Sequence, residues 1–307
     1  MRKIILLCAL FFTMVLLMSA SPVRAQNALW VGPNGSDGNA CTATAPCATF
    51  AGAYGKGSVA QINCLGSGHY GPITITTSLT LDCGDGNVGN IVSSTAGIAI
   101  GTSGGATIVL RHLALNGLGG LGGSGIDASD LFSGTLIVED CMIHGYHNGD
   151  GINFQPQSGR GLLQVSNSQI FDTVAGILVS PARGQIASVT LNNVELTGNS
   201  QNGLVLGGAG VVAGTMRNSV AGANTSDGVL ANAGQVFFTI EESSIVDNLS
   251  NGIQTSSAGS AVKVAASTIG GNGTGVLASA GSIVSFGDNH VSDNGSNGNF
   301  TSTTALR

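Results

Sequence analysis

The chain has 307 residues, of which only 8% are charged, and a formal net charge of −6. It has no basic patch, so it lacks the electrostatic footprint of a protein that binds nucleic acid or an anionic membrane surface. The same acidity disfavours polyanionic partners, anionic uronate polymers included, unless a local cation or metal offsets the field.

The first 25 residues have the layout of a signal peptide. Arg2 and Lys3 precede an apolar run over residues 4–18, and Val23 and Ala25 place the expected cleavage before Gln26. The alternative is an uncleaved membrane anchor, but the apolar run is shorter than the roughly 20 residues that span a bilayer. We therefore expect a secreted or periplasmic protein with no membrane segment after cleavage.

Five cysteines remain after the signal peptide, and export permits disulfide bonds between them. Cys41 and Cys47 enclose a short loop that contains a proline, whereas Cys64 and Cys83 each end a segment with the pattern of a strand. We predict the pairs Cys41–Cys47 and Cys64–Cys83. Cys141 is left over, and its apolar neighbours predict a buried, unreactive thiol.

Residues 26–96 are predicted to form an N-terminal cap and the first coils. Residues 29–38 begin as a strand and a turn, and residues 46–54 can form a short helix. A helix there would cover the open edge of the first coil, which otherwise invites aggregation.

Residues 97–298 carry an internal repeat. A glycine followed by an aliphatic residue recurs about every 25 residues, and such a period is typical of a solenoid. The pairs are Gly97-Ile98, Gly125-Ile126, Gly151-Ile152, Gly176-Ile177, Gly203-Leu204, Gly228-Val229, Gly252-Ile253 and Gly275-Val276. We predict that each pair begins a strand.

A second pair of apolar positions lies five residues apart within each repeat. The pairs are Leu110/Leu115, Val138/Ile143, Val165/Ile170, Leu191/Leu196, Thr215/Val220, Ile240/Ile245, Val264/Ile269 and Phe286/Val291, of which only Thr215/Val220 is weak. Alternation around them has the period of two that strands require. Stacking the coils ~4.8 Å apart would pair their backbones in parallel. The sequence predicts an all-β, single-stranded right-handed parallel β-helix with a short capping helix.

A polar column accompanies the repeat. Asp172, Asn199, Asn224 and Asn248 each lie four residues before a repeat glycine, Asn294 has the same relation to Gly298, and Asn272 is shifted by one. Asparagine tolerates left-handed turns and bonds to neighbouring backbone, so we predict an asparagine ladder. Residues 299–307 are expected to be a short polar tail.

The sequence resembles a known family at several points. The opening Trp30-Val31-Gly32-Pro33-Asn34-Gly35-Ser36-Asp37, the segment Pro46-Cys47-Ala48-Thr49-Phe50 and the Gly-Ile coils are similar to secreted bacterial right-handed β-helix repeat proteins of the pectate-lyase-like superfamily, in a group without assigned activity. The likeness spans nearly the whole mature chain. It implies the fold, but the superfamily includes lyases, hydrolases, epimerases, tailspikes and adhesins, so it implies no single activity.

The catalytic residues of that superfamily do not transfer. Its lyases set several acidic residues on neighbouring coils for calcium, with a basic residue as the base, and this sequence has no such dense acidic set. Its polygalacturonases need an Asn-Thr-Asp segment, paired aspartates and a Gly-His-Gly segment. Here Asn148-Gly149-Asp150-Gly151 matches the first of these only in part, and the other two do not occur. No cofactor and no resident metal are implied.

One group of ionisable residues remains as a candidate catalytic site. The five-residue spacing places His112 and Asp140 ~5 Å apart on consecutive coils, with His144 above Asn116 in a nearby column. The three could act as a base with its orienting group or ligate a divalent metal. The alternative is that His112, Asp140, Asn167 and Asn193 form a solvated polar column.

Further residues around this group could bind a glycan. His147 and Arg160 are polar, and Tyr146 and Phe154 are the nearest aromatic side chains, with Phe132 and Phe171 beyond them. Asp150, just before Gly151, is also explained by turn chemistry.

The leading interpretation is an exported β-helix scaffold that presents an elongated surface to an extracellular or envelope glycan, without clear catalytic machinery. The alternatives are a polysaccharide lyase, hydrolase or epimerase acting between His112 and Asp150, and a surface adhesin. The sequence predicts neither the oligomeric state nor the identity of the polysaccharide.

Overall fold

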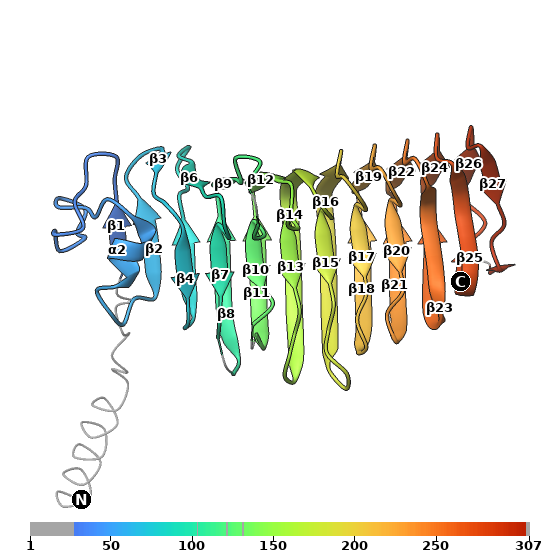
Figure 1. The fold of residues 1–307 in the computed structure, drawn as a ribbon, viewed down its shortest axis with the longest axis horizontal. Coiled ribbons are helices and arrows are strands. Elements are labelled where there is room, and N and C mark those ends of the chain that lie inside the picture. Colours follow the sequence, from blue (N-terminus) through green and yellow to red (C-terminus); the bar gives the residue numbers. More distant parts are fainter. Residues whose placement is uncertain (1–27, 103, 121, 131, 305–307) are drawn as a thin grey trace, which may run out of the picture.

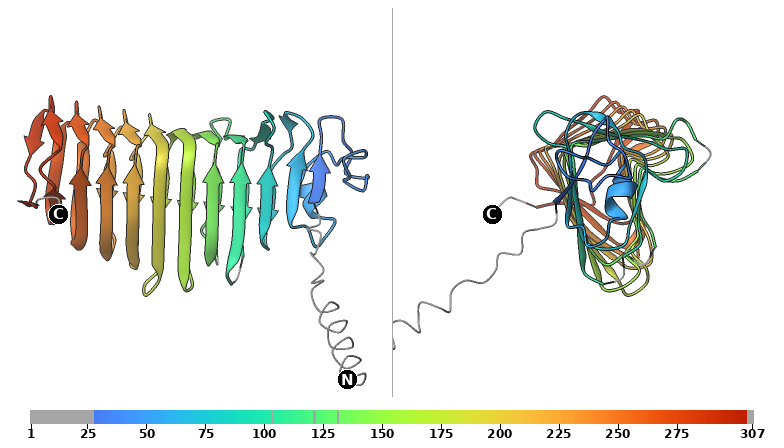
Figure 2. Two further views of the ribbon diagram at one scale, coloured as in Figure 1. Left: turned by 180° about the vertical axis from the view of Figure 1, so that it is seen from behind. Right: turned by 90° about the vertical axis from the view of Figure 1, so that its left-hand side faces the viewer.

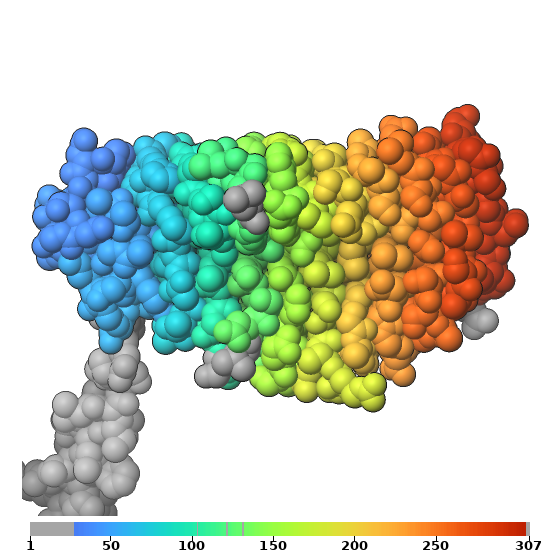
Figure 3. Space-filling view, viewed as in Figure 1, coloured from blue at the N-terminus to red at the C-terminus, as the bar shows by residue number. Residues whose placement is uncertain are grey.

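The computed structural model describes residues 28–102, 104–120, 122–130 and 132–304. The predicted signal peptide lies outside these residues. Within them, no helix is long and apolar enough to cross a membrane. The described chain winds into an elongated stack of coils that follow one another in sequence order from end to end (Figures 1 and 3).

Each complete coil contributes a strand segment to each of three faces, and long strands pass from one face to the next. The first face contains β4 (Ile73–Ile75), β7 (Ile98–Ile100), β10 (Ile126–Ala128), β13 (Ile152–Phe154), β15 (Ile177–Val179), β17 (Leu204–Leu206), β20 (Val229–Ala231), the starts of β23 (Asn251–Ala265) and β25 (Thr274–Ser285), and β27 (Ser296–Gly298). These include every strand that a Gly-aliphatic pair was predicted to begin.

The second face contains β1 (Ala28–Val31), β2 (Gln61–Cys64), β5 (Leu79–Asp82), β8 (Ala106–Arg111), β11 (Gly134–Glu139), the starts of β14 (Arg160–Thr173) and β16 (Ile186–Thr197), β18 (Val211–Arg217), β21 (Gln235–Glu241), the ends of β23 and β25, and β28 (Ser302–Thr303). The third face contains β3 (Gly68–His69), β6 (Gly89–Val92), β9 (Leu113–Asn116), β12 (Met142–Tyr146), the ends of β14 and β16, β19 (Val220–Gly222), β22 (Ser244–Val246), β24 (Thr268–Gly270) and β26 (His290–Ser292).

Pairing between coils is parallel throughout the named strands. In the first face Ile126 pairs with both Ile98 and Ile152, and Ile152 pairs in turn with Ile177. The one antiparallel bridge among the described residues, Thr42 to Ala45, lies inside a small disulfide loop. The predicted parallel β-helix is therefore confirmed.

The core is a narrow column of aliphatic side chains from all three faces. Ile177 is fully buried, as its place after a repeat glycine predicts. The glycines themselves are explained by close approach between coils: a Cβ at Gly151 would lie 2.2 Å from Cγ2 of Ile170 and 2.6 Å from the carbonyl oxygen of Gly176. Any side chain there would force the coils apart.

A turn of one left-handed residue separates the second face from the third. His112, Asp140, Asn167 and Asn193 occupy it on consecutive coils, with φ between 50° and 56°. Asn and Asp, and to a lesser degree His, are enriched in this conformation. We call these four residues the turn column.

The asparagine ladder is confirmed from Asn199 to Asn294. Side-chain amides link Asn199 to Asn224, Asn224 to Asn248, Asn248 to Asn272 and Asn272 to Asn294 at 2.8–2.9 Å. The prediction that Asp172 belongs to it is wrong, because the hydroxyl of Thr173 bonds to Asn199 at 2.8 Å and Asp172 turns outward. The ladder residues are also not left-handed: that conformation falls one residue earlier, as at Ala223 and Asp247.

A buried serine column, which the sequence did not predict, runs beside the ladder. Ser219, Ser243 and Ser267 each donate their hydroxyl to the carbonyl two residues earlier. The hydroxyls of Ser243 and Ser267 also accept the backbone N–H of the serine one coil before, at 3.2 Å. Cys141 lies in a matching position, where its thiol is free and buried as predicted, and burial raises the pKa of this thiol to about 12.

Two predicted apolar pairs are out of register by one residue. Met216, and not Thr215, pairs with Leu191 and Ile240, and Ala221 lies in the core in place of Val220. In the last coil Ser285 pairs with Val264, so Phe286 falls outside the register, while Val291 pairs with Ile269 as predicted.

The N-terminal end contains the predicted helix, which is limited to α2 (Phe50–Tyr54). Thr49 caps it by accepting the N–H of Gly52 at 2.9 Å, and Phe50 is buried. Viewed end-on, α2 and the nearby loops lie over this end of the solenoid (Figure 2). Both predicted disulfides, Cys41–Cys47 and Cys64–Cys83, are present.

Candidate functional site

The corner between the second and third faces brings His112 and Asp140 together. Both side chains leave the turn column on consecutive coils, and Nε2 of His112 lies 3.7 Å from Oδ2 of Asp140. The other ring nitrogen, Nδ1, lies 2.9 Å from Oδ1 of Asp82, one coil earlier. His112 therefore bridges two carboxylates on either side of its own coil.

The sequence pattern does not predict that Asp82 belongs to this corner. Asp82 pairs with Arg111, whose Nε donates to Glu139 at 2.8 Å. These three residues end successive strands of the second face, so an alignment of strand ends could have found Asp82.

His144 does not join this corner. It lies in register with Asn116, as predicted, and with Phe171, whose ring it stacks on at a centroid distance of 5.0 Å. Among the described residues no contact connects it with His112 or Asp140. Of the three predicted residues only His112 and Asp140 come together, and Asp82 takes the place expected for His144.

The corner has a possible base, but the three hollows described below lie elsewhere. Asp82 could orient the His112 ring, which is the arrangement of a general base and its positioning group. However, Nε2 faces Asp140, and none of the hollows described below includes these residues. Within the described part of the chain no group of three or more His, Cys, Asp or Glu residues is arranged to hold a metal ion.

The predicted aromatic lining is wrong. Tyr146 and Phe154 are 2% and 0% exposed, and Phe154 packs edge-on against Phe132 inside the coils. The Tyr146 ring fills the space over Gly97 and Gly125, where a Cβ would come within 2.6 Å and 3.2 Å of it. Phe154 faces inward because it alternates with the half-buried Asn153 along β13, and Tyr146 ends β12 as part of the core.

The remaining predicted binding residues are dispersed. His147 pairs with Asp172 at 3.0 Å, and Arg160 is exposed and donates to the hydroxyl of Ser188. Asp150 accepts the N–H of Ala175 at 3.1 Å, which is the turn role considered for it. Burial, with a contribution from nearby Asp127, raises the pKa of Asp150 to about 6 despite this hydrogen bond.

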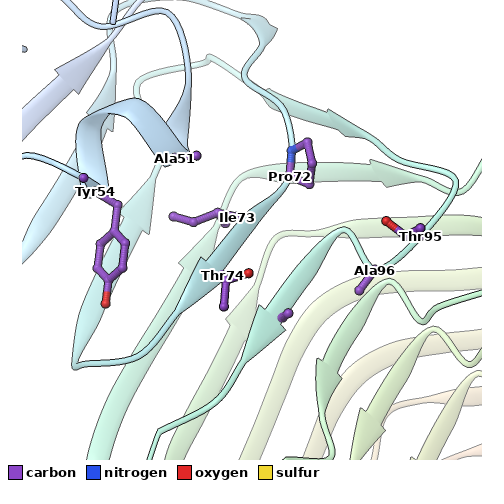
Figure 4. A pocket seen from close by; sticks show the side chains of 9 residues that line it. Ala51, Tyr54, Pro72, Ile73, Thr74, Thr95 and Ala96 are labelled. Atoms are coloured by element: carbon purple, nitrogen blue, oxygen red, sulfur yellow. The ribbon is translucent and has the colours of Figure 1, made fainter.

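Hollows instead lie over the first face near the N-terminal end. One of about 540 Å³ is lined by α2, the start of β4 and Thr95, Ala96 and Ala99. Tyr54 and Thr95 stand on opposite sides of it, with Ile73 and Thr74 between them (Figure 4).

Two further hollows adjoin the first. One of about 500 Å³ shares Thr95 and extends over Gly120, Gly122 and Gly123. One of about 120 Å³ shares Thr74 and Ala99 and extends to Asp127, Ser129 and Asp130. The three form a depression across β4, β7 and β10, which we call the first-face groove.

Tyr54 is held firmly in the wall of this groove. Its oxygen accepts the backbone N–H groups of Thr76 and Thr77 at 3.0 Å each and lies 3.2 Å and 2.9 Å from their hydroxyls. Burial tends to raise the pKa of Tyr54, but these hydrogen bonds lower it below its ordinary value. Four contacts at the hydroxyl fix the direction of the ring.

The sequence contained a signal for part of the groove. Thr74, Ala99 and Asp127 each follow the first buried residue of a first-face strand, so alternation points them outward into the groove. Tyr54 carried no such signal, because its place depends on how α2 packs on β4.

Comparisons with known proteins support the architecture. A family model described as "Right handed beta helix region" matches residues 175–305. No curated protein matches the sequence. The solved structure of pectate lyase Pel9A is 17% identical with a TM-score of 0.60, over 84% of this chain and 74% of that one. The A-module of the Azotobacter vinelandii mannuronan C-5 epimerase AlgE4 is 13% identical with a TM-score of 0.47, over 90% of this chain and 98% of that one.

Proposed function

We propose that this right-handed parallel β-helix is an exported protein that binds an extracellular or envelope polysaccharide in the first-face groove. The observation that carries the proposal is the groove itself, which is open along three coils and walled by the immobilised ring of Tyr54. Sites for flexible sugar chains combine an aromatic surface with hydroxyl and carboxylate partners, and here Thr74, Thr95 and Asp127 supply such groups.

Three further observations support this class of partner. The two disulfides fit a protein of an oxidising compartment. The net charge of −6 disfavours nucleic acid. A pectate lyase shares the fold, which is compatible with a polysaccharide partner although a fold alone does not transfer chemistry.

Binding is favoured over catalysis by the position of the only candidate base described above. His112 lies at the corner between the second and third faces, whereas the groove lies on the first face. A lyase, hydrolase or epimerase at His112 would need its substrate at a corner where Asp140 already faces the reactive nitrogen.

A glycan array with labelled protein, followed by titration calorimetry on each hit, tests the proposal. Tyr54→Ala should weaken binding at least about fivefold, because an aromatic contact is worth on the order of 1 kcal/mol beyond its buried area. Tyr54→Phe keeps the ring and should lose less binding affinity than Tyr54→Ala. Phe237→Ala is the matched control, since Phe237 is 56% exposed on β21 of the second face.

Thermal melting of each variant shows whether the fold is retained. If Phe237→Ala and Tyr54→Ala lose affinity for the glycan equally, binding in the groove is contradicted. The same holds if Tyr54→Ala binds the glycan as tightly as the wild type.

A further inference from the structure

The charged side chains that line the first-face groove are all acidic. Asp127 and Asp130 line its smallest part, and no Lys, Arg or His lines any of the three hollows in the described chain. The nearest basic residue in sequence to Tyr54 is Lys56, whose amine donates to the carbonyl oxygen of Asp37 at 2.7 Å. His147 lies beside Gly119 at the rim, where Asp172 already pairs with it.

We propose that the groove selects neutral saccharides and rejects polyuronates, an inference that rests on the proposed function and specifies its ligand class. A uronate carries a carboxylate on every sugar, so a bound chain would bring like charges against Asp127 and Asp130. Such juxtaposition is a common way to exclude a wrong partner. A neutral chain brings hydroxyls, which can donate to the same carboxylates.

Tyr54 supplies the attractive part of this selection. Because its hydroxyl is already engaged by Thr76 and Thr77, binding does not have to immobilise the ring, and preorganised groups lose less entropy on association. The ring carries no net charge, and its electron-rich face suits the C–H face of a neutral sugar. Ile73 and Ala99 extend the same apolar floor.

A bridging cation is the obvious way in which a uronate could still bind. Asp127 and Asp130 are too few for a protein-only calcium site. One oxygen of Asp127 already accepts the N–H of Ser129 at 3.1 Å. The experiment therefore includes calcium as a separate condition.

Titration calorimetry on the full mature chain provides the test. The probes are hexasaccharides of β-1,4-glucose, α-1,4-glucose and β-1,4-mannose, set against hexagalacturonate and hexamannuronate, each in EDTA and in millimolar calcium. We expect at least one neutral probe to bind at least about tenfold more tightly than either uronate in both buffers. Its affinity should change little between low and high salt, since no ion pair forms.

The variant Asp127→Asn with Asp130→Asn should raise the ratio of uronate to neutral affinity about tenfold, whereas Asp288→Asn, a carboxylate near the far end of the chain, should leave that ratio unchanged. A uronate that binds more tightly than every neutral probe, with or without calcium, overturns the selectivity but leaves groove binding standing. Absence of binding by both classes, in both buffers, overturns the proposed function itself.

Discussion

At the scale of single residues, the left-handed turn accounts for most of the chemistry that gathers at His112. The conformation, with φ of 56° at His112 and 52° at Asp140, favours Asp, Asn and His at this turn. Polar residues chosen for the turn then project from neighbouring coils and meet one another. The His112–Asp140 contact therefore follows from the turn, Asp82 joins it from the end of β5, and neither contact requires a catalytic role.

Substitution at the corner separates these two roles. We expect His112→Ala and Asp140→Asn to leave glycan binding in the groove unchanged, with His112→Ala less stable by about 1 kcal/mol because the hydrogen bond to Asp82 is lost. His112→Gly, which relieves the backbone strain, is the control in the same melting experiment. If a polysaccharide-cleaving or epimerising activity is found and both variants lower turnover by roughly 10² to 10⁴, the corner is catalytic after all.

Asp150 should make stability depend on pH. Its folded-state pKa of about 6 lies above the unfolded value near 3.8, so the folded protein holds the proton more tightly. The resulting stabilisation is complete below about pH 4 and is lost as the pH rises through about 6, which leaves a penalty of about 3 kcal/mol at neutral pH.

Asp150→Asn keeps the acceptor for Ala175 and removes this charge. We expect the variant to be more stable than the wild type at pH 7.5 and equal to it at pH 4, measured by urea unfolding. Asp247→Asn, at an exposed turn, should show no such difference. If Asp150→Asn raises the free energy of unfolding by the same amount at both pH values, the raised pKa of Asp150 is contradicted.

At the scale of strands, alternation and the repeat glycines predicted the coils well, because each face buries every second residue against a fixed column. The prediction failed where a coil uses an unusual core residue. In this coil the core residues are Met216 and Ala221, which are not β-branched. The strand pattern favours β-branched residues and therefore predicts the adjacent Thr215 and Val220 instead. The ladder prediction fails at Thr173 for a different reason: Thr173 lies three residues before Gly176 and not four, and its hydroxyl replaces an asparagine amide at the end of the ladder.

The candidate site was harder to predict than the strands. Burial of Tyr146 and Phe154 depends on how much room each coil leaves inside, which a single sequence does not specify. The groove depends on three separate segments, α2, β4 and the loop before β10, whose packing no local pattern encodes.

The register of the first face can be tested at β15. Ile177→Asp should abolish soluble expression, because an unpaired charge would enter the aliphatic column. Leu178→Asp is the matched control: the adjacent side chain points outward, so this variant should be soluble. Equal behaviour of the two variants in a soluble-expression and melting assay would refute the assigned inward and outward faces.

At the scale of the whole molecule, the two ends of the stack are held differently. Both disulfides lie in the N-terminal coils, and Cys64–Cys83 ties β2 to the end of β5. The last coil carries only the short strands β27 and β28, paired on one side with β25. In a solenoid each coil is stabilised mainly by its neighbours. Because the last coil has a neighbour on one side only, the protection of backbone amides against hydrogen exchange should fall towards the C-terminus.

Hydrogen exchange monitored by mass spectrometry measures this gradient. We expect amides of β27 and β28 to exchange first and amides of the central coils last. In the double variant Cys64→Ser, Cys83→Ser, exchange in β2 and β5 should rise, since a disulfide typically contributes about 2–4 kcal/mol. Uniform exchange along the stack would show that the coils open together.

The one-sided placement of the disulfides also determines how the protein responds to a mechanical load. If the two ends were pulled apart, the parallel coils would detach one after another from the unclamped C-terminal end. Each coil of about 25 residues would release roughly 8 nm of chain, since an extended residue spans about 3.3–3.6 Å. The N-terminal coils, where the groove begins, would be the last to yield, so a polysaccharide bound as we propose would stay in place while the rest of the stack extends as a tether.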